Sequence, residues 1–256
     1  MKDLFDLKNK VALITGATSG MGKAIAEAMG IHGAKIIVSS NDTEGGIQTV
    51  EDFKSKEIEA VFIPCDMSKK ADIEQLYAQS IAFFGKIDIL VSCVGIARPN
   101  LFLDINADDF EKTMALNLQS AIYLTKLVVP LMQERRDGVL IYLASIAGVR
   151  GNKNIGLYGI SKAGLIQLAR NLAVEFGPYN IRVNAISPGM IDTPFSQGLM
   201  SNDDFMKKRL ALTPLRRVGT VAEIAGVAVL LASKAGGFIT GQNIVVDGGT
   251  TISDGS

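Results

Sequence analysis

The residues with the clearest chemical potential are Tyr158 and Lys162, which form a Tyr-x-x-x-Lys pair. A spacing of four residues places both side chains on one face of a helix. A phenol with a pKa of about 10 is a poor base at neutral pH. An ammonium group ~4–5 Å away favours the phenolate by roughly 3–4 kcal/mol at an effective dielectric constant near 20. The pair could therefore exchange a proton with a substrate, although such spacing alone is more often a coincidence of a helix face.

The composition excludes several other kinds of catalytic site. His32 is the only histidine and follows an apolar helical pattern, which is typical of a helix end rather than of a Ser-His-Asp triad. One histidine together with Cys65 and Cys93, which lie far apart in the sequence, argues against a zinc site and a disulfide scaffold, so we expect no metal. Acid–base chemistry near neutral pH must then come from tyrosine, lysine or carboxylates.

Charge and hydropathy also limit the partners. The chain has 26 basic and 26 acidic residues, and a net charge of zero predicts neither a nucleic-acid partner nor an anionic membrane partner. The charged stretch at the N-terminus does not resemble a signal peptide, and we identify no run typical of a membrane span. The expected location is the cytoplasm.

Apolar runs alternate with amphipathic stretches along the whole chain. Repeated β–α units whose strands are apolar on both faces predict a Rossmann-like, doubly wound parallel sheet of seven strands with helices on both faces, in a single α/β domain over residues 1–256. The predicted strands are 11–15, 35–39, 60–64, 87–92, 138–144, 181–187 and 243–247, and the predicted helices are 22–31, 43–56, 69–84, 108–133, 156–176 and 221–233.

One segment, at about 190–218, is longer than an ordinary strand-to-helix connection and mixes Pro, Phe, Met and charged residues. At the carboxyl edge of a parallel sheet, such an insertion predicts a substrate lid. Its apolar side chains favour a pocket for a hydrophobic ketone or secondary alcohol, although they could equally anchor the lid to the body. The candidate substrate residues are Ile146, Met190, Phe195, Met200 and Phe205.

A glycine-rich turn follows the first predicted strand and opens a helix. Gly16 permits a tight turn, Gly20 lets the backbone approach a pyrophosphate, and Gly22 lets the helix pack closely on the strand. The exposed amides at the start of the helix can then face phosphate groups. This arrangement predicts a dinucleotide site.

The end of the second strand should meet the adenosine ribose, where an acidic residue favours NAD(H) and an arginine favours NADP(H). Ser40 and Asn41 satisfy neither rule. With no nearby cation and with Asp42 and Glu44 close in the sequence, a 2′-phosphate would be poorly compensated, which favours NAD(H) over NADP(H).

Together these residues resemble the short-chain dehydrogenase/reductase family, from about residue 7 to 250. The matching pieces are TGATSGMG at 15–22, Asp66, Asn117 within LNLQS, Ser145, YGISK at 158–162, SPGMIDT at 187–193 and VDGG at 246–249. The resemblance implies a catalytic tetrad of Asn117, Ser145, Tyr158 and Lys162. It also implies cofactor contacts from Gly16, Thr18, Ser19, Gly20, Met21, Gly22, Ser40, Asn41, Asp66, Met67, Gly95, Tyr158, Lys162, Pro188, Gly189, Ile191 and Thr193.

The resemblance gives each member of the tetrad a role. Tyr158 would exchange the hydroxyl proton while hydride passes between the substrate carbon and the nicotinamide, and Ser145 would hydrogen-bond the developing alkoxide. Lys162 would also hold the nicotinamide ribose, and Asn117 would place a water that relays protons. One departure from the family pattern is the stretch 92–95, which reads Ser-Cys-Val-Gly where an Asn-Ala-Gly motif is usual.

These features predict a carbonyl reductase or secondary-alcohol dehydrogenase. The alternatives are a 3-oxoacyl-thioester reductase, for which the basic run 207–209 could meet an acyl carrier or coenzyme A, and, more remotely, a non-catalytic dinucleotide-binding protein. By the resemblance, the helices at 108–133 and 156–176 would pack in pairs across two-fold axes, so we expect a homotetramer.

Overall fold

Seven parallel strands form the sheet, in the order β3-β2-β1-β4-β5-β6-β7, in a computed structural model that describes residues 4–253. Every neighbouring pair is parallel. The predicted single α/β domain with a doubly wound sheet is confirmed. The strands are β1 Val11–Thr15, β2 Lys35–Ser40, β3 Ala60–Pro64, β4 Ile89–Ser92, β5 Gly138–Leu143, β6 Ile181–Pro188 and β7 Asn243–Val246.

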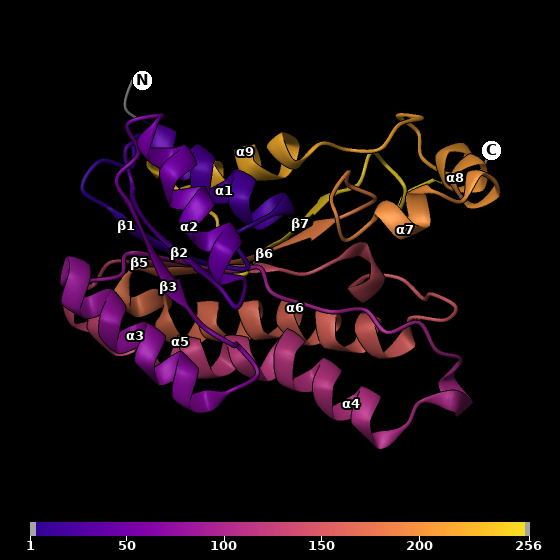
Figure 1. The fold of residues 1–256 in the computed structure, drawn as a ribbon, viewed down its shortest axis with the longest axis horizontal. Coiled ribbons are helices and arrows are strands. Elements are labelled where there is room, and N and C mark those ends of the chain that lie inside the picture. The colour runs from indigo at the N-terminus through magenta and orange to yellow at the C-terminus, as the bar shows by residue number, and fades with distance from the viewer. Residues whose placement is uncertain (1–3, 254–256) are drawn as a thin grey trace.

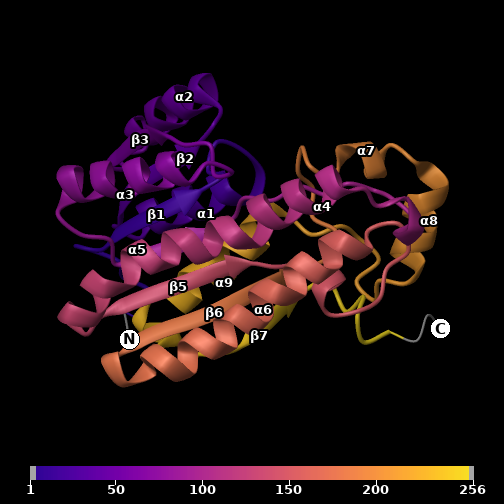
Figure 2. The ribbon, with the colours of Figure 1, turned by 90° about the horizontal axis from the view of Figure 1, so that it is seen from below.

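Helices cover both faces of this sheet (Figures 1 and 2). On one face lie α1 Gly20–Ile31, α2 Thr43–Lys54 and α9 Val221–Ala232, with α1 packed against α9. On the other face lie α3 Lys70–Phe84, α5 Ser120–Arg135 and α6 Gly156–Phe176. Each layer therefore buries its own hydrophobic core against the sheet.

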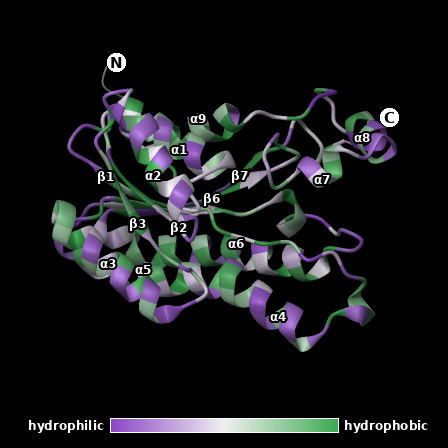
Figure 3. Ribbon diagram, viewed as in Figure 1, coloured by the Kyte–Doolittle hydropathy of each residue, from purple (hydrophilic) through white to green (hydrophobic). Residues whose placement is uncertain are grey.

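Strand β5 shows why its residues form a central strand. All six residues are buried, and successive side chains point to opposite faces of the sheet. Val139, Ile141 and Leu143 enter the core beneath α1 and α9, whereas Leu140 and Tyr142 enter the core beneath α5 and α6. In Figure 3 the strands are mostly in the colour of hydrophobic residues, while the helices carry both colours.

The helix predicted at 108–133 is not continuous. It consists of α4 Ala107–Met114, a π-helical segment Ala115–Gln119 and α5. The π segment inserts a wide turn at Asn117, whose buried side chain bonds neighbouring segments. By length and hydropathy alone the run Ala107–Arg135 could cross a membrane, a test that core helices also pass. Here it packs against α3 and α6.

The segment 190–218 leaves the carboxyl end of β6 and carries two short helices, α7 Gln197–Met200 and α8 Asp203–Ala211. Its two ends are tied together, because Gly219 N donates to Met190 O at 2.9 Å and Asp192 N donates to Gly219 O at 2.9 Å. The segment is thus a closed excursion on a fixed base, as a lid requires.

The order of the strands indicates where a ligand site lies on the sheet. The chain winds outward from β1 to β2 and β3, and then returns to add β4 on the other side of β1. A crevice opens at such a switch point, outside the carboxyl ends of the strands. The glycine turn after β1 and the 92–95 stretch after β4 both lie there.

Candidate active site

A single cavity of about 830 Å³ opens at this crevice and joins most of the predicted site residues. This volume lies within the range typical of sites for small molecules. Of the predicted residues, the cavity is lined by Gly16, Thr18, Ser19, Gly20, Met21, Gly22, Ser40, Asn41, Asp66, Met67, Gly95, Tyr158, Lys162, Thr193 and Phe195.

The glycine turn has the backbone that a phosphate cradle requires. Gly16 and Gly20 have φ angles of +67° and +52°, in the left-handed region that favours glycine. A Cβ atom on Gly22 would lie 2.1 Å from the carbonyl oxygen of Gly16, so only glycine lets α1 start this close to the turn. Ser19, the residue before α1, makes no side-chain cap, which leaves the first amides of the helix directed at the cavity.

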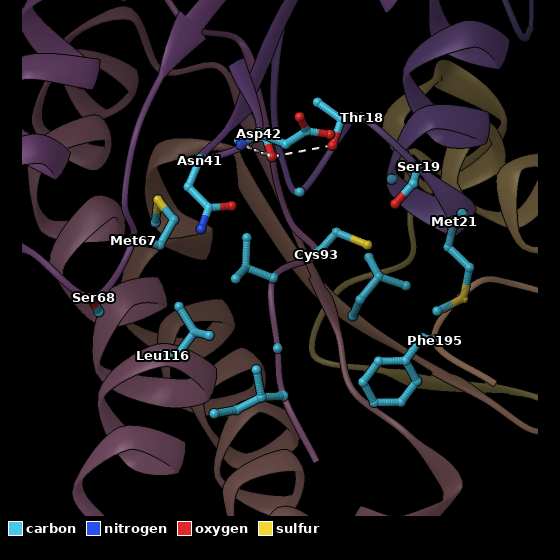
Figure 4. Close-up of a pocket in the computed structure, with 18 of the residues that line it drawn as sticks. Thr18, Ser19, Met21, Asn41, Asp42, Met67, Ser68, Cys93, Leu116 and Phe195 are labelled. Atoms are coloured by element: carbon cyan, nitrogen blue, oxygen red, sulfur yellow. Dashed lines mark hydrogen bonds between the residues drawn. The ribbon is translucent and has the colours of Figure 1, made fainter. Parts of the chain in front are cut away.

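The part of the cavity beside the carboxyl end of β2 is polar, and no arginine lines it (Figure 4). Ser40 Oγ accepts hydrogen bonds from Thr18 Oγ1 at 3.2 Å and from Asp42 N at 3.1 Å. Asp42 caps α2 by accepting from Gly45 N at 3.0 Å, so its carboxylate is engaged with its own helix. Asn41 makes no such bond and lines the cavity.

Asp66 lies where β3 ends and is held in a fixed position. Its carboxylate accepts from Ser68 N at 3.0 Å and from Ser68 Oγ at 2.7 Å, and these hydrogen bonds lower the pKa of Asp66. Met67 beside it is buried. Met67 and Leu116, the latter from the π segment, form the wall of the cavity opposite Met21 of α1 (Figure 4).

Tyr158 and Lys162 both face the cavity from α6, as the helical spacing predicts. The Lys162 Nζ atom lies 5.6 Å from the centroid of the Tyr158 ring and donates to the carbonyl oxygen of Leu143 at 2.7 Å. Because Lys162 bonds the end of β5, helix α6 and the central sheet hold the ammonium group between them.

The pKa values differ from the expected effect of lysine on tyrosine. Burial raises the pKa of Tyr158, which the hydrogen bond from Ser145 offsets in part. Burial also lowers the pKa of Lys162, to about 8. The expectation considered only the attraction between the charges, whereas the loss of hydration opposes the charged form of both groups. In this environment Tyr158 is protonated at neutral pH.

Ser145 and Asn117 complete the predicted tetrad, but neither of them lines the cavity. Ser145 begins the 3₁₀ turn Ile146–Gly148, and its Oγ accepts from Ala147 N at 3.1 Å. Asn117 Oδ1 accepts from Ile96 N at 2.8 Å, and its Nδ2 donates to Ile96 O at 2.9 Å and to Ser161 Oγ at 3.0 Å. Asn117 therefore holds the segment that follows β4 against α6. Its side chain does not line the cavity.

Gly95, the residue of the usual motif that this chain retains, lies between these groups. A Cβ atom there would be 3.1 Å from Lys162 Nζ and 3.3 Å from Asn117 Oδ1, so its lack of a side chain brings the backbone close to both. Cys93 takes the place of the asparagine and lines the cavity, and burial raises the pKa of its thiol to about 11.

Three of the predicted cofactor residues lie beneath the cavity surface. Pro188 is buried at the end of β6, and a Cβ atom on Gly189 would lie 2.7 Å from Asp247 Cα. Ile191 is buried and pairs with Gly219 at the base of the segment 190–218. Thr193, by contrast, reaches the cavity beside Gly20.

Of the five candidate substrate residues, the structure brings only Phe195 to the cavity, where its ring centroid lies 6.4 Å from that of Tyr158. Ile146 is buried in the turn after Ser145, and Met190 lies at the base of the segment 190–218. Met200 contacts Ser196 within this segment. The Phe205 ring packs under the guanidinium of Arg209 at 5.5 Å, so it belongs to α8 rather than to this cavity.

The cavity also includes residues that the sequence did not single out. These lining residues are Cys65, Ser68, Ile96, Asp108, Glu111, Lys112, Ala115, Leu116, Leu143, Ala144 and Pro194. Except for Leu116, which adjoins Asn117, these residues belong to no motif of the sequence. Those on α4 reach the cavity only through the tertiary packing of that helix. Within residues 4–253, no three His, Cys, Asp or Glu side chains gather as a metal site.

The buried lysine should give the protein a measurable pH dependence. Its pKa falls from 10.5 to about 8 on folding, so between these pH values the unfolded chain binds a proton that the folded chain has released. The free energy of unfolding therefore rises with pH in this window. We expect wild type to gain about 3 kcal/mol relative to Lys162→Met between these limits in urea denaturation. A difference that stays constant with pH would contradict this.

Comparison with known proteins adds independent evidence about the family of this chain. A family model described as enoyl-(acyl carrier protein) reductase matches residues 16–251. An uncharacterized oxidoreductase of Thermotoga maritima is 38% identical over 253 residues, which cover 96% of this chain and 99% of the relative.

Solved structures agree in fold. A 7α-hydroxysteroid dehydrogenase, in complex with NADH and 7-oxo glycochenodeoxycholic acid, is similar with a TM-score of 0.93 and 35% identity, over 97% of each chain. A gluconate 5-dehydrogenase from Burkholderia cenocepacia, in complex with NADP and tartrate, is similar with a TM-score of 0.94 and 29% identity, over 98% of each chain.

Proposed function

Because the chain belongs to the short-chain dehydrogenase/reductase family, we propose that it is an NAD(P)-dependent oxidoreductase that interconverts a ketone and a secondary alcohol. Tyr158 is the general acid and base in this proposal. The observation that carries it is the meeting of Tyr158 and Lys162 with the glycine turn of β1 in one cavity. Hydride exchange with the substrate carbon is the chemistry that a bound nicotinamide would supply.

The residues of this chain would supply the proton and the polar contacts. Since burial raises the pKa of Tyr158, the phenol is protonated at neutral pH and can donate to the oxygen of a ketone as negative charge develops there. Ser145, which hydrogen-bonds Tyr158, can donate to the same oxygen. Lys162, held by Leu143 O, stabilises the phenolate that remains and can hold a ribose hydroxyl.

Asn117 has a supporting part in this proposal. Its hydrogen bonds to both backbone groups of Ile96 fix the wall of the cavity beside Gly95. We propose that Asn117 also helps to place a water molecule that relays protons. Its side chain lies near Lys162, because a Cβ atom on Gly95 would be 3.3 Å from Asn117 Oδ1 and 3.1 Å from Lys162 Nζ.

We further propose that the preferred cofactor is NAD(H). The lining residues at the ends of β2 and β3 include Asp42 and Asp66 but no arginine or lysine. A 2′-phosphate placed beside Asn41 would lose hydration without gaining a cation. The cationic side chains of the cavity lining, Lys112 and Lys162, belong to α4 and α6 instead.

The test is ketone reduction with NADH and with NADPH over a panel of ketones. We expect turnover with both, and a kcat/KM roughly tenfold or more higher with NADH, since about 1.4 kcal/mol of uncompensated phosphate is enough for that ratio. Asn41→Arg supplies the missing cation and should move the ratio toward NADPH. No turnover of any ketone would refute the enzyme proposal, and a preference for NADPH in wild type would refute the cofactor preference.

The lid at 190–218 would close over a substrate with an apolar part. Phe195 supports this, because its half-exposed ring lies against Tyr158 at the mouth of the cavity. The homotetramer also remains a proposal, supported by exposed apolar side chains on the outer faces of the fold. These include Ile160 and Val174 on α6, Phe238, and Val245 on the edge strand β7.

A further inference from the structure

The turn 191–196, which follows β6, forms part of the cavity wall. Thr193 lies beside the glycine turn, because a Cβ atom on Gly20 would be 3.5 Å from the Cβ and Cγ2 atoms of Thr193. Phe195 lies against Tyr158, with 6.4 Å between the ring centroids. The turn therefore spans the part of the cavity between the phosphate cradle and the proposed proton donor, where the nicotinamide of a bound dinucleotide would react.

A buried hydroxyl group, that of Ser196, holds this turn together. Ser196 Oγ accepts a hydrogen bond from Thr193 N at 3.1 Å, and it lies 3.2 Å from Thr193 Oγ1 and 2.6 Å from Ile191 O. Ser196 N donates to Thr193 O at 3.0 Å, which closes the turn a second time. Because Ser196 is only 6% exposed, water would not readily replace its hydroxyl group as a partner of these atoms.

The single hydrogen of the Ser196 hydroxyl group has a preferred acceptor. A serine hydroxyl carries one hydrogen and two lone pairs. The nearest acceptor is Ile191 O, whereas Thr193 O lies at 3.0 Å and the Met200 sulfur at 3.4 Å. Thr193 O already accepts from Ser196 N, and a thioether sulfur is a weak acceptor. Ser196 therefore donates to Ile191 O, and its lone pairs face Thr193.

This arrangement fixes the direction of the Thr193 hydroxyl group. One lone pair of Ser196 Oγ accepts from Thr193 N, and the other accepts the hydrogen of Thr193 Oγ1. Of the hydrogen bonds found within residues 4–253, this is the only one that involves Thr193 Oγ1. The hydrogen of Thr193 is thus engaged, while its lone pairs stay available at a residue that lines the cavity.

We propose that Ser196 is a positioning residue for the cofactor, which holds Thr193 so that Thr193 Oγ1 accepts a hydrogen bond from the carboxamide N–H of a bound nicotinamide. This inference rests on the proposed function and adds a residue that belongs to no motif of the sequence. A carboxamide presents N–H donors on one side and a carbonyl acceptor on the other. A threonine hydroxyl that rotates freely meets either side, whereas one engaged with Ser196 selects the N–H side.

The experiment measures binding by calorimetry with three probes. NADH carries the carboxamide, reduced 3-acetylpyridine adenine dinucleotide has a methyl group in place of the NH₂ group, and ADP-ribose lacks the nicotinamide. The proteins are wild type, Ser196→Ala, Thr193→Val, the double variant and the control Ser201→Ala. Ser201 is an exposed serine of the same segment, and its Oγ donates to Gln197 O at 2.9 Å.

We expect wild type and Ser201→Ala to bind NADH more tightly than the acetylpyridine analogue. Ser196→Ala should weaken NADH binding by roughly three- to tenfold and lose this preference, because one hydrogen bond no longer has a fixed direction. ADP-ribose should bind within about twofold of wild type. The double variant should bind NADH as Thr193→Val does, since Ser196 acts through Thr193. Ser196→Thr keeps a hydroxyl group and should recover part of the affinity.

Other results would overturn the inference. An equal loss of NADH and ADP-ribose affinity in Ser196→Ala would indicate a general loosening of the site, and additive losses in the double variant would show that Ser196 does not act through Thr193. An unchanged preference for NADH over the analogue would refute the role of Ser196 while the proposed function stands. If wild type binds neither NADH nor NADPH, the proposed function is refuted and this inference with it. Ser196→Cys, with a thiol that bonds only weakly, takes the place of Ser196→Ala if the alanine variant does not fold.

Discussion

Tyr158→Phe should lower kcat by roughly 10² to 10⁴, because the change removes the only atom of the side chain that can pass a proton to the substrate. The phenyl ring keeps the contact with Phe195 and the packing on α6, so the cavity keeps its shape. Cofactor affinity, measured by quenching or transfer of NADH fluorescence, should remain within about twofold of wild type.

Tyr142→Phe is the matched control for this substitution. Tyr142 is a fully buried tyrosine on β5 whose hydroxyl lies 2.7 Å from Thr125 Oγ1, away from the lining of the cavity. Its removal should cost about 1 kcal/mol of stability without a change in kcat. Equal kcat values for wild type and Tyr158→Phe would rule out Tyr158 as the acid. A loss of NADH binding in Tyr158→Phe would instead indicate that the Tyr158 hydroxyl positions the cofactor.

Gly22→Ala should have the opposite signature, a loss of cofactor binding. The new Cβ atom would lie 2.1 Å from Gly16 O, a backbone atom that can move only if the turn between β1 and α1 opens. Overpacking of this kind costs about 1–3 kcal/mol, which corresponds to roughly ten- to a hundredfold in NADH affinity if the turn moves. Titration of NADH fluorescence measures it.

Gly226→Ala provides the control for Gly22→Ala. Gly226 lies on an exposed position of α9, where a Cβ atom would meet nothing within 4 Å. Alanine there should stabilise the helix by about 0.5–1 kcal/mol and leave NADH affinity as it is. Wild-type affinity in Gly22→Ala would show that the turn tolerates a side chain and that its close packing does not shape the site.

Features set by local sequence were predictable. The apolar runs predict β1 and β3 to the residue. All five residues of β1 are buried, as expected for a strand covered on both faces. The order of glycines also predicts the turn before α1, since Gly16 and Gly20 adopt backbone angles that other residues disfavour.

Features set by contacts across the fold were not predictable. The π segment depends on hydrogen bonds between Asn117 and Ile96, which periodicity cannot reveal. The position of Phe205 depends on which face of α8 turns toward the body. Its ring lies under the Arg209 guanidinium group instead of in the cavity. Likewise, the raised pKa of Tyr158 follows from its burial, a property of the assembled core rather than of the four-residue spacing to Lys162.

The paired ends of the segment 190–218 have an evolutionary consequence. Met190 and Asp192 are both hydrogen-bonded to Gly219. The segment from Asp192 to Gly219 therefore begins and ends at neighbouring points of the body. Residues can therefore be inserted, deleted or exchanged in α7 and α8 without altering the register of β6 and β7. In the proposed function, the proton-transfer residues lie on α6, whereas the segment that would cover the substrate is attached to the body separately. We therefore expect that substitutions in this segment can change the preferred substrate while the proposed chemistry stays the same.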